Sequence, residues 1–206
     1  MIYWISGVAC SGKSTLIKSL LNESEVSHQL RTVYKPTNKF SCVKFQDFLL
    51  VGSNYLNDKI KTPGIDAWFR TPGIDSHKFR EEHLKLLIEQ EYLKHNILLE
   101  TFSPYLFNLD IILNLISKYN LKIFFLHTDK NTLDKRGIER NQYYDKQRTE
   151  KIKSNELKRT ELVINHSMVK PHVTILKNSN KKDLSNNVKL IYKNLRSENG
   201  GKSKIR

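Results

Sequence analysis

A glycine-rich pattern near the start of the chain constrains the fold more than any other feature. Residues 7–14 read Gly-Val-Ala-Cys-Ser-Gly-Lys-Ser and match the phosphate-binding pattern G-x-x-x-x-G-K-[ST] in full. The pattern follows a short apolar run, Ile2 to Ile5, and precedes a segment with apolar residues at helical spacing. A strand, a glycine-rich turn and a helix in this order predict a phosphate cradle.

The residue types in this loop suit a nucleoside triphosphate. Glycines allow successive backbone N–H groups to point at the phosphates, and the next helix adds its positive N-terminal end. We expect Lys13 to reach the β- and γ-phosphates and the Ser14 hydroxyl to ligate Mg²⁺, with ATP and Mg²⁺ as cofactors. The residues expected to bind the nucleotide are Gly7, Val8, Ala9, Cys10, Ser11, Gly12, Lys13, Ser14 and Thr15.

Apolar runs alternate with helical patterns along the chain. Strands are predicted over 2–5, 30–34, 43–51, 96–100, 122–127 and 172–176, and helices over 13–21, 77–95, 105–117 and 184–195. Alternating strands and helices predict a parallel sheet covered on both faces. We expect one domain over residues 1–196, followed by a basic disordered tail over 197–206.

Composition limits the setting and the partners of the protein. The chain has no run of 18 apolar residues, no signal-peptide pattern and only two cysteines, which favours a soluble cytoplasmic protein without membrane contact. Residues 170–206 hold ten Lys or Arg against two acidic residues, so +8 of the net charge of +14 lies there. This distribution suits DNA bound through the C-terminal region, or it reflects a chain generally rich in Lys and Asn.

The chain resembles the P-loop nucleoside and nucleotide kinase family in its size, its N-terminal loop and the basic helix that follows the run 122–127. The resemblance implies a three-layer α/β/α fold with a five-stranded parallel sheet and a helical lid over about 129–162. Arg136 and Arg140 are four residues apart, so they project from one helix face, where the family's lid arginines stabilise the transferring phosphoryl group. Arg148 is a third candidate in the same segment.

Carboxylates complete the expected site. Glu100 closes the apolar run Ile97 to Leu99, at the place where related kinases hold an acid near Mg²⁺ or the acceptor. Asp66 and Asp75 end two copies of Thr-Pro-Gly-Ile-Asp, where each is either an acceptor-side carboxylate or an ordinary turn residue. The resemblance also places adenine near residues 178–180.

The acceptor region, residues 48–80, resembles bacteriophage kinases that act on 5-hydroxymethyl-deoxyuridine in DNA. The resemblance is carried by Leu-Leu-Val-Gly-Ser-Asn-Tyr at 49–55 and Gly-Ile-Asp at 64–66, with Ser53-Asn54 replacing a single basic residue and Ile65 replacing Thr. It implies that the hydroxymethyl group of 5-hydroxymethyluracil in phage DNA is the acceptor. Trp68, Phe69 and Arg70 would then offer a stacking surface for an extracted base beside a phosphate ligand. The alternative is ordinary burial, which the sequence favours for Phe69.

Two alternatives remain open from the sequence. A deoxynucleoside monophosphate kinase could grip its acceptor phosphate with arginines such as Arg31, Arg70 and Arg80. A non-catalytic protein that binds ATP as a regulatory or repair accessory would keep the same loop. The sequence does not choose between ATP and GTP, and it leaves the oligomeric state open.

Overall fold

The computed structural model describes residues 1–22, 32–37, 40–45, 48–51, 76–100, 109–139, 155 and 157–197. The predictions for Asp66, Asp75, Arg140 and Arg148 lie outside these residues, as do those for Arg31, for residues 68–70 and for the tail from 198 onward. The Arg80 side chain lies outside the description as well.

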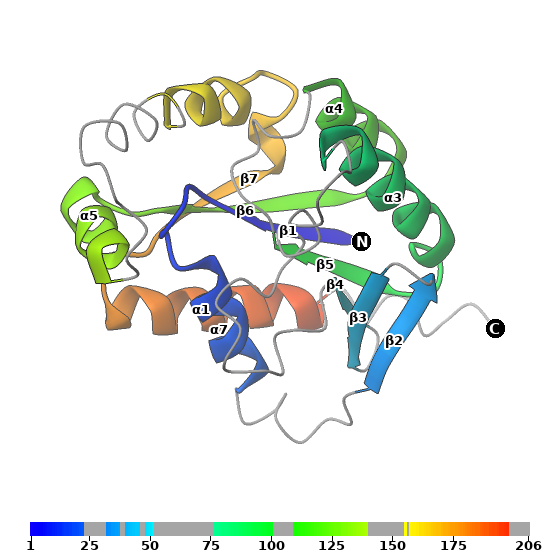
Figure 1. Cartoon of the computed structure of the whole chain (residues 1–206), viewed down its shortest axis with the longest axis horizontal. Helices are drawn as coiled ribbons and strands as arrows, with labels where there is room; N and C mark the ends of the chain where they lie inside the picture. The colour runs from blue at the N-terminus through cyan, green and yellow to red at the C-terminus, as the bar shows by residue number, and fades with distance from the viewer. Residues whose placement is uncertain are drawn as a thin grey trace.

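A seven-stranded sheet in the order β2-β3-β4-β5-β1-β6-β7 forms the centre of the described structure (Figure 1). The strands are β1 Ile2–Ser6, β2 Thr32–Thr37, β3 Phe40–Phe45, β4 Phe48–Val51, β5 Asn96–Glu100, β6 Leu121–His127 and β7 Val173–Lys177. Strands β4, β5, β1, β6 and β7 are mutually parallel and confirm the expected five parallel strands. Strands β2 and β3 extend the sheet in antiparallel fashion, which the sequence did not predict.

Two strand predictions are wrong in detail. Residues 43–51 were predicted as one strand, but they belong to two antiparallel strands, β3 and β4, with Phe45 paired to Phe48. The second strand was predicted to end at residue 34, yet β2 continues through Pro36 to Thr37. A proline fits there because β2 is the outermost strand and its register shifts between Tyr34 and Thr37.

Helices cover both faces of the sheet. Figure 1 shows α1 (Lys13–Leu21) and α7 (Lys181–Ser197) on one face, and α3 (Ser76–Glu91) and α4 (Leu109–Lys118) on the other. Alternate β1 residues face opposite ways, so Tyr3 and Ile5 pack in the α1 and α7 core, whereas Ile2 and Trp4 pack in the α3 and α4 core. This arrangement confirms the three-layer prediction.

The remaining described elements lie near the β6 and β7 side. They are α5 (Lys130–Glu139), residues 157–164, which are helical, and a short 3₁₀ turn, η4 (Lys170–His172). No helix in the described part of the chain is long and apolar enough to cross a membrane.

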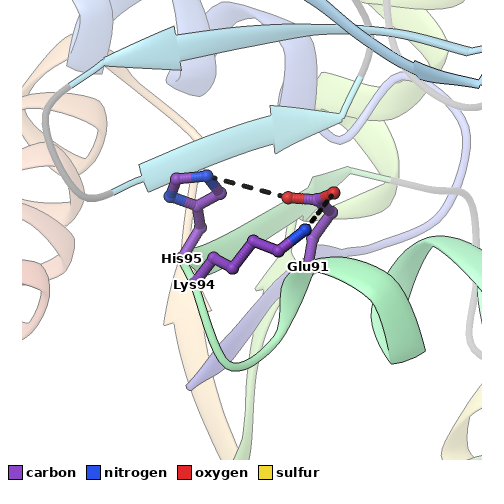
Figure 2. A network of polar contacts seen from close by, with 3 residues as sticks. All are labelled: Glu91, Lys94 and His95. Atoms are coloured by element: carbon purple, nitrogen blue, oxygen red, sulfur yellow. Dashed lines mark hydrogen bonds and ion pairs between the residues drawn. The ribbon is translucent and has the colours of Figure 1, made fainter.

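Helix α3 ends in a buried carboxylate that two neighbouring residues face (Figure 2). Glu91 is 2% exposed, and its Oε1 lies 3.5 Å from Lys94 Nζ while its Oε2 lies 3.7 Å from His95 Nε2. A carboxylate at the C-terminal end of a helix is opposed by the helix dipole, and the Lys94 ammonium group offsets part of this unfavourable position. This cluster precedes β5 and therefore lies at the amino ends of the parallel strands.

The order of the parallel strands fixes where a ligand can bind. Strand β1 lies between β5 and β6 in the sheet. The chain segments that follow these strands therefore lead away from one another at the carboxyl end of β1. In open α/β sheets this divergence leaves a crevice at the carboxyl ends of the strands. The loop of residues 7–12 directly follows β1 and therefore lies at this carboxyl end of the sheet.

Candidate nucleotide-binding site

The loop after β1 has the backbone shape that a phosphate cradle requires. Gly12, which precedes α1, has φ 93°, a left-handed conformation that side chains disfavour. A Cβ added at Gly12 would also lie 2.6 Å from Asn178 Nδ2, and one added at Gly7 would lie 2.6 Å from Ser11 Oγ. Both glycines are therefore required by close approach of neighbouring atoms.

Cys10 is the one non-glycine residue with positive φ in the described part of the chain. Its φ is 65°, and a left-handed backbone costs an L-residue roughly 1–2 kcal/mol. The side chain is buried in a small apolar cluster with Val8 and Leu133, which joins the loop to α5. Packing of this side chain thus offsets the backbone cost.

Lys13 is buried inside the loop. Its Nζ donates hydrogen bonds to the backbone oxygens of Gly7 at 2.8 Å and Val8 at 3.0 Å, and the residue is 6% exposed. These bonds hold the ammonium group across the loop, where a buried positive charge stabilises an anionic ligand. The sequence-predicted contact of Lys13 with phosphates is compatible with this position.

Ser14 and Glu100 meet at the start of α1. Ser14 Oγ donates a 2.8 Å hydrogen bond to Glu100 Oε1, and Glu100 is 3% exposed at the end of β5, beside Ile5 of β1. A hydroxyl and a carboxylate are hard oxygen ligands, and Mg²⁺ sites commonly combine one or two such groups with substrate phosphates. The pair therefore fits Mg²⁺. No group of three or more His, Cys, Asp or Glu side chains that could hold a metal occurs among the described residues.

The backbone oxygen of Ser11 receives three side-chain donors. They are Asn178 Nδ2 at 2.6 Å, Thr128 Oγ1 at 3.2 Å and Arg136 Nη1 at 3.3 Å; Arg136 Nη1 also lies 3.4 Å from the oxygen of Cys10. The sequence predicted a phosphoryl-directed role for Arg136, and the structure brings its guanidinium group to the loop. Thr128 and Asn178 were missed as loop contacts, although each is a polar residue directly after an apolar strand.

Asp129 fixes the start of α5 beside this contact. Its Oδ1 accepts the Thr132 N–H at 2.9 Å and its Oδ2 accepts the Thr132 hydroxyl at 2.7 Å, as in an N-cap. Hydrogen bonds from the Ser179 hydroxyl, then from the Thr132 backbone and hydroxyl, hold the pKa of Asp129 well below its usual range. An ionised, capped Asp129 keeps the preceding Thr128 in place.

The start of α7 is capped in a similar way. Asn180 Oδ1 accepts the Asp183 N–H at 2.9 Å, and Asp183 Oδ2 accepts the Ser179 N–H at 2.9 Å. Asn178 extends the pairing of β6 and β7 by one bond, from its N–H to the His127 oxygen at 2.9 Å. The segment 178–180 is therefore held at both ends.

A cavity of about 460 Å³ opens beside the loop, at the position where the sequence places adenine. Its lining residues come from the loop, α1, α5 and the segment 178–184: Gly12, Thr15, Arg136, Glu139, Asn178, Ser179, Asn180, Lys181 and Leu184. Its volume lies within the usual range for small-molecule sites. The cavity adjoins the loop through Gly12 and Thr15, so one ligand can reach both.

No model of a known protein family matches the chain, and no curated protein matches it. Among solved structures, the chain resembles an uncharacterized protein from Eubacterium ventriosum (TM-score 0.49, 16% identity, 96% of this chain and 98% of that chain). It resembles shikimate kinase from Aquifex aeolicus (TM-score 0.49, 19% identity, 98% and 99%). It also resembles thymidylate kinase from Ehrlichia chaffeensis (TM-score 0.43, 15% identity, 95% and 98%).

Proposed function

We propose that the protein is an ATP-dependent kinase that transfers the γ-phosphate to a hydroxyl group of a nucleotide-type acceptor. The observation that carries this proposal is the arrangement of three side chains around the loop. Lys13 supplies a buried positive charge, and Ser14 meets Glu100 where a metal-bound phosphate would lie. These parts belong to one domain, with its lid beginning at α5.

The chain's own groups act chiefly by position and charge. Lys13 would exchange its bonds to the Gly7 and Val8 oxygens for bonds to phosphate oxygens, and Ser14 and Glu100 would hold Mg²⁺. The ion would neutralise part of the phosphate charge. Arg136, whose bonds to the loop oxygens are long at 3.3 and 3.4 Å, is one of two proposed lid arginines, with Arg140.

The acceptor side begins beside Glu100. Strand β4 pairs in parallel with β5, so its last residue, Val51, lies at the same edge of the sheet as Glu100. The chain leaves β4 for residues 52–75 at this edge. This connection supports the assignment of the acceptor side to residues 48–80, with Asp66 as the proposed acceptor-side carboxylate.

A basic stripe on α7 favours DNA as the carrier of the acceptor. Lys182, Lys189, Lys193 and Arg196 are exposed and spaced seven, four and three residues apart, so they share one helix face. The opposite face of α7 is buried in the core. We therefore propose 5-hydroxymethyluracil in phage DNA as the first acceptor, with a deoxynucleoside monophosphate as the alternative.

Transfer of labelled γ-phosphate from ATP tests both acceptors in parallel. The reactions contain duplex DNA with 5-hydroxymethyluracil, the same duplex with thymine, and a panel of deoxynucleoside monophosphates. Label on the modified duplex alone supports the DNA kinase, and label on a monophosphate alone supports the alternative. ATP binding without transfer to any acceptor would contradict the kinase proposal and favour a non-catalytic ATP-binding protein.

A separate experiment tests whether the basic stripe on α7 binds DNA. Replacing Lys189, Lys193 and Arg196 by Ala should weaken DNA binding and reduce the salt slope by about three, at roughly 0.9 per phosphate contact. The matched control replaces three exposed lysines on other surfaces, Lys85, Lys118 and Lys158. Equal losses in the two triple variants would mean that α7 has no specific part in DNA binding.

A further inference from the structure

The bond between Asn178 and Ser11 joins two loops that are far apart in the sequence. Asn178 Nδ2 lies 2.6 Å from the Ser11 backbone oxygen, and Asn178 is 2% exposed. A carbonyl oxygen only accepts hydrogen bonds, so the amide nitrogen must face it. Among the described residues, the buried Asn178 Oδ1 has no hydrogen-bond partner. The side chain thus keeps one buried acceptor without a hydrogen bond, a cost that an apolar residue at this position would not have. Its donor is directed at the Ser11 oxygen.

The backbone around Asn178 is held firmly. Its N–H bonds the His127 oxygen at 2.9 Å, and its oxygen lies 3.2 Å from Thr128 Oγ1. Thr128 and Asn178 directly follow the neighbouring parallel strands β6 and β7, and β6 pairs with β1, which leads into the loop. The sheet therefore sets the distance from Asn178 to Ser11.

The orientation of one peptide group follows from this bond. The Ser11 oxygen and the Gly12 N–H belong to the same planar trans peptide and point in opposite directions. Holding the oxygen toward Asn178 turns the Gly12 N–H away from it, and a phosphate cradle depends on the direction of such N–H groups. Gly12 also lacks a Cβ, which would lie 2.6 Å from Asn178 Nδ2.

We propose that Asn178 is a positioning residue that orients the Ser11–Gly12 peptide and so links the base cavity to the phosphate loop. The inference rests on the proposed nucleotide site and adds a residue whose effect on phosphate binding is indirect. Asn178 lines the cavity and bonds the loop, so one side chain serves both. Loss of Asn178 should therefore weaken the binding even of a ligand that has phosphates but no base.

The test compares ADP with inorganic tripolyphosphate, which carries phosphates and no base, by calorimetry on the full chain. Asn178→Asp keeps the shape of the side chain but replaces the donor with an acceptor facing the Ser11 oxygen. We expect both ligands to bind about tenfold more weakly, since the buried oxygen loses its closest donor. The ¹⁵N–¹H NMR signal of Gly12 should shift in the same variant.

Asn187→Asp is the matched control. Asn187 is 7% exposed, and its Nδ2 donates a 2.7 Å bond to the Lys177 oxygen, so the same change removes a similar bond away from the loop. We expect this control to lower the melting temperature while leaving tripolyphosphate affinity and the Gly12 signal unchanged. Thr128→Val should weaken tripolyphosphate binding slightly, and Thr128→Ser, which retains the hydroxyl, should restore it.

A pH profile separates positioning from general damage. The carboxyl group introduced by Asn178→Asp can donate a hydrogen bond once protonated, and burial favours its protonated form. The ratio of variant to wild-type tripolyphosphate affinity should therefore recover as pH falls, whereas Asn178→Ala should show no recovery.

Three results would overturn the inference. Weaker ADP binding with unchanged tripolyphosphate binding would make Asn178 a base contact only. Equal effects of Asn178→Asp and Asn187→Asp on tripolyphosphate would reduce the bond to general stability. If the wild-type protein binds both ligands and Asn178→Asp binds them equally well, the inference is refuted but the proposed function stands. If the wild-type protein binds neither ligand, the proposed function itself is refuted.

Discussion

Ser14 and Glu100 share a 2.8 Å hydrogen bond between the first turn of α1 and the last residue of β5. The two residues lie 86 positions apart in the sequence, and the parallel pairing of β1 with β5 brings them together. Burying a carboxylate is unfavourable unless charge and hydrogen bonds compensate it, and Glu100 is 3% exposed. The proposed Mg²⁺ would add positive charge beside this carboxylate.

Glu100→Gln should therefore raise the Mg²⁺ concentration needed for half-maximal phosphoryl transfer by about 10–100-fold, as loss of a carboxylate near a metal commonly does. Labelled ATP and a Mg²⁺ titration measure it. Glu82→Gln, on the exposed side of α3, is the control and should leave the titration unchanged. An unaltered Mg²⁺ dependence in Glu100→Gln would remove this residue from the metal site.

Lys13→Met should reduce the transfer rate by at least about 100-fold, because a preorganised charge at the reacting phosphates is lost. The Gly7 and Val8 oxygens also lose their donor. Lys18→Met, five residues further along α1, serves as the control for removing one lysine from this helix. A similar rate in Lys13→Met and wild type would contradict the proposed mechanism.

The Asp129 cap predicts a pH dependence of stability. Since its folded pKa lies below the ordinary value, the cap stabilises the protein at neutral pH, and this contribution is lost as pH falls through the folded pKa. Asp129→Ala should lower the melting temperature at pH 7, and the difference from wild type should shrink at pH below about 4, where an ordinary Asp protonates.

Asp129→Asn is the control for that experiment. Asparagine can accept the same Thr132 N–H bond but does not titrate, so Asp129→Asn should keep part of the cap at pH 7 and should lie closer to wild type than Asp129→Ala does. A difference between Asp129→Ala and wild type that stays constant down to strongly acidic pH would contradict the assigned cause.

The cluster of Glu91, Lys94 and His95 predicts that the coupling energies of Glu91 with its two neighbours differ. A double-mutant cycle by urea unfolding should give a larger coupling energy for Glu91 with His95, where both side chains are largely buried, than for Glu91 with Lys94. The cycle with Lys94, whose side chain is 61% exposed, should give below about 1 kcal/mol. The proposed phosphoryl transfer should not change, because the cluster lies at the opposite ends of the strands from the loop. A larger coupling to Lys94 would contradict the role of burial.

The sequence predicts the parts of this site that are contiguous. Strand β1, the loop and α1 follow one another within 21 residues, so a local pattern is sufficient. Glu100 can also be predicted from the sequence, because it is an acidic residue that ends an apolar run. The contacts of Thr128 and Asn178 with Ser11 span 117 and 167 residues, and they depend on β6 and β7 lying beside β1. No local pattern contains that adjacency.

The misread strand has a related cause. The apolar residues of 43–51 suit one strand or two, since alternation does not show where a chain reverses. Only the pairing of Val43 with Leu50 distinguishes them. Similarly, a proline ends a central strand but is accepted at an outer one, and the position of β2 in the sheet is a tertiary property.

The outer position of β2 bears on the chain's behaviour at high concentration. An exposed edge of a sheet can template pairing with a second chain, and long regular edges do so most readily. In β2 the regular ladder is interrupted between Tyr34 and Thr37, and Pro36 within the interruption has no N–H to offer. Among the described strands, the outer edge of the sheet therefore offers a second chain an irregular ladder with one N–H missing.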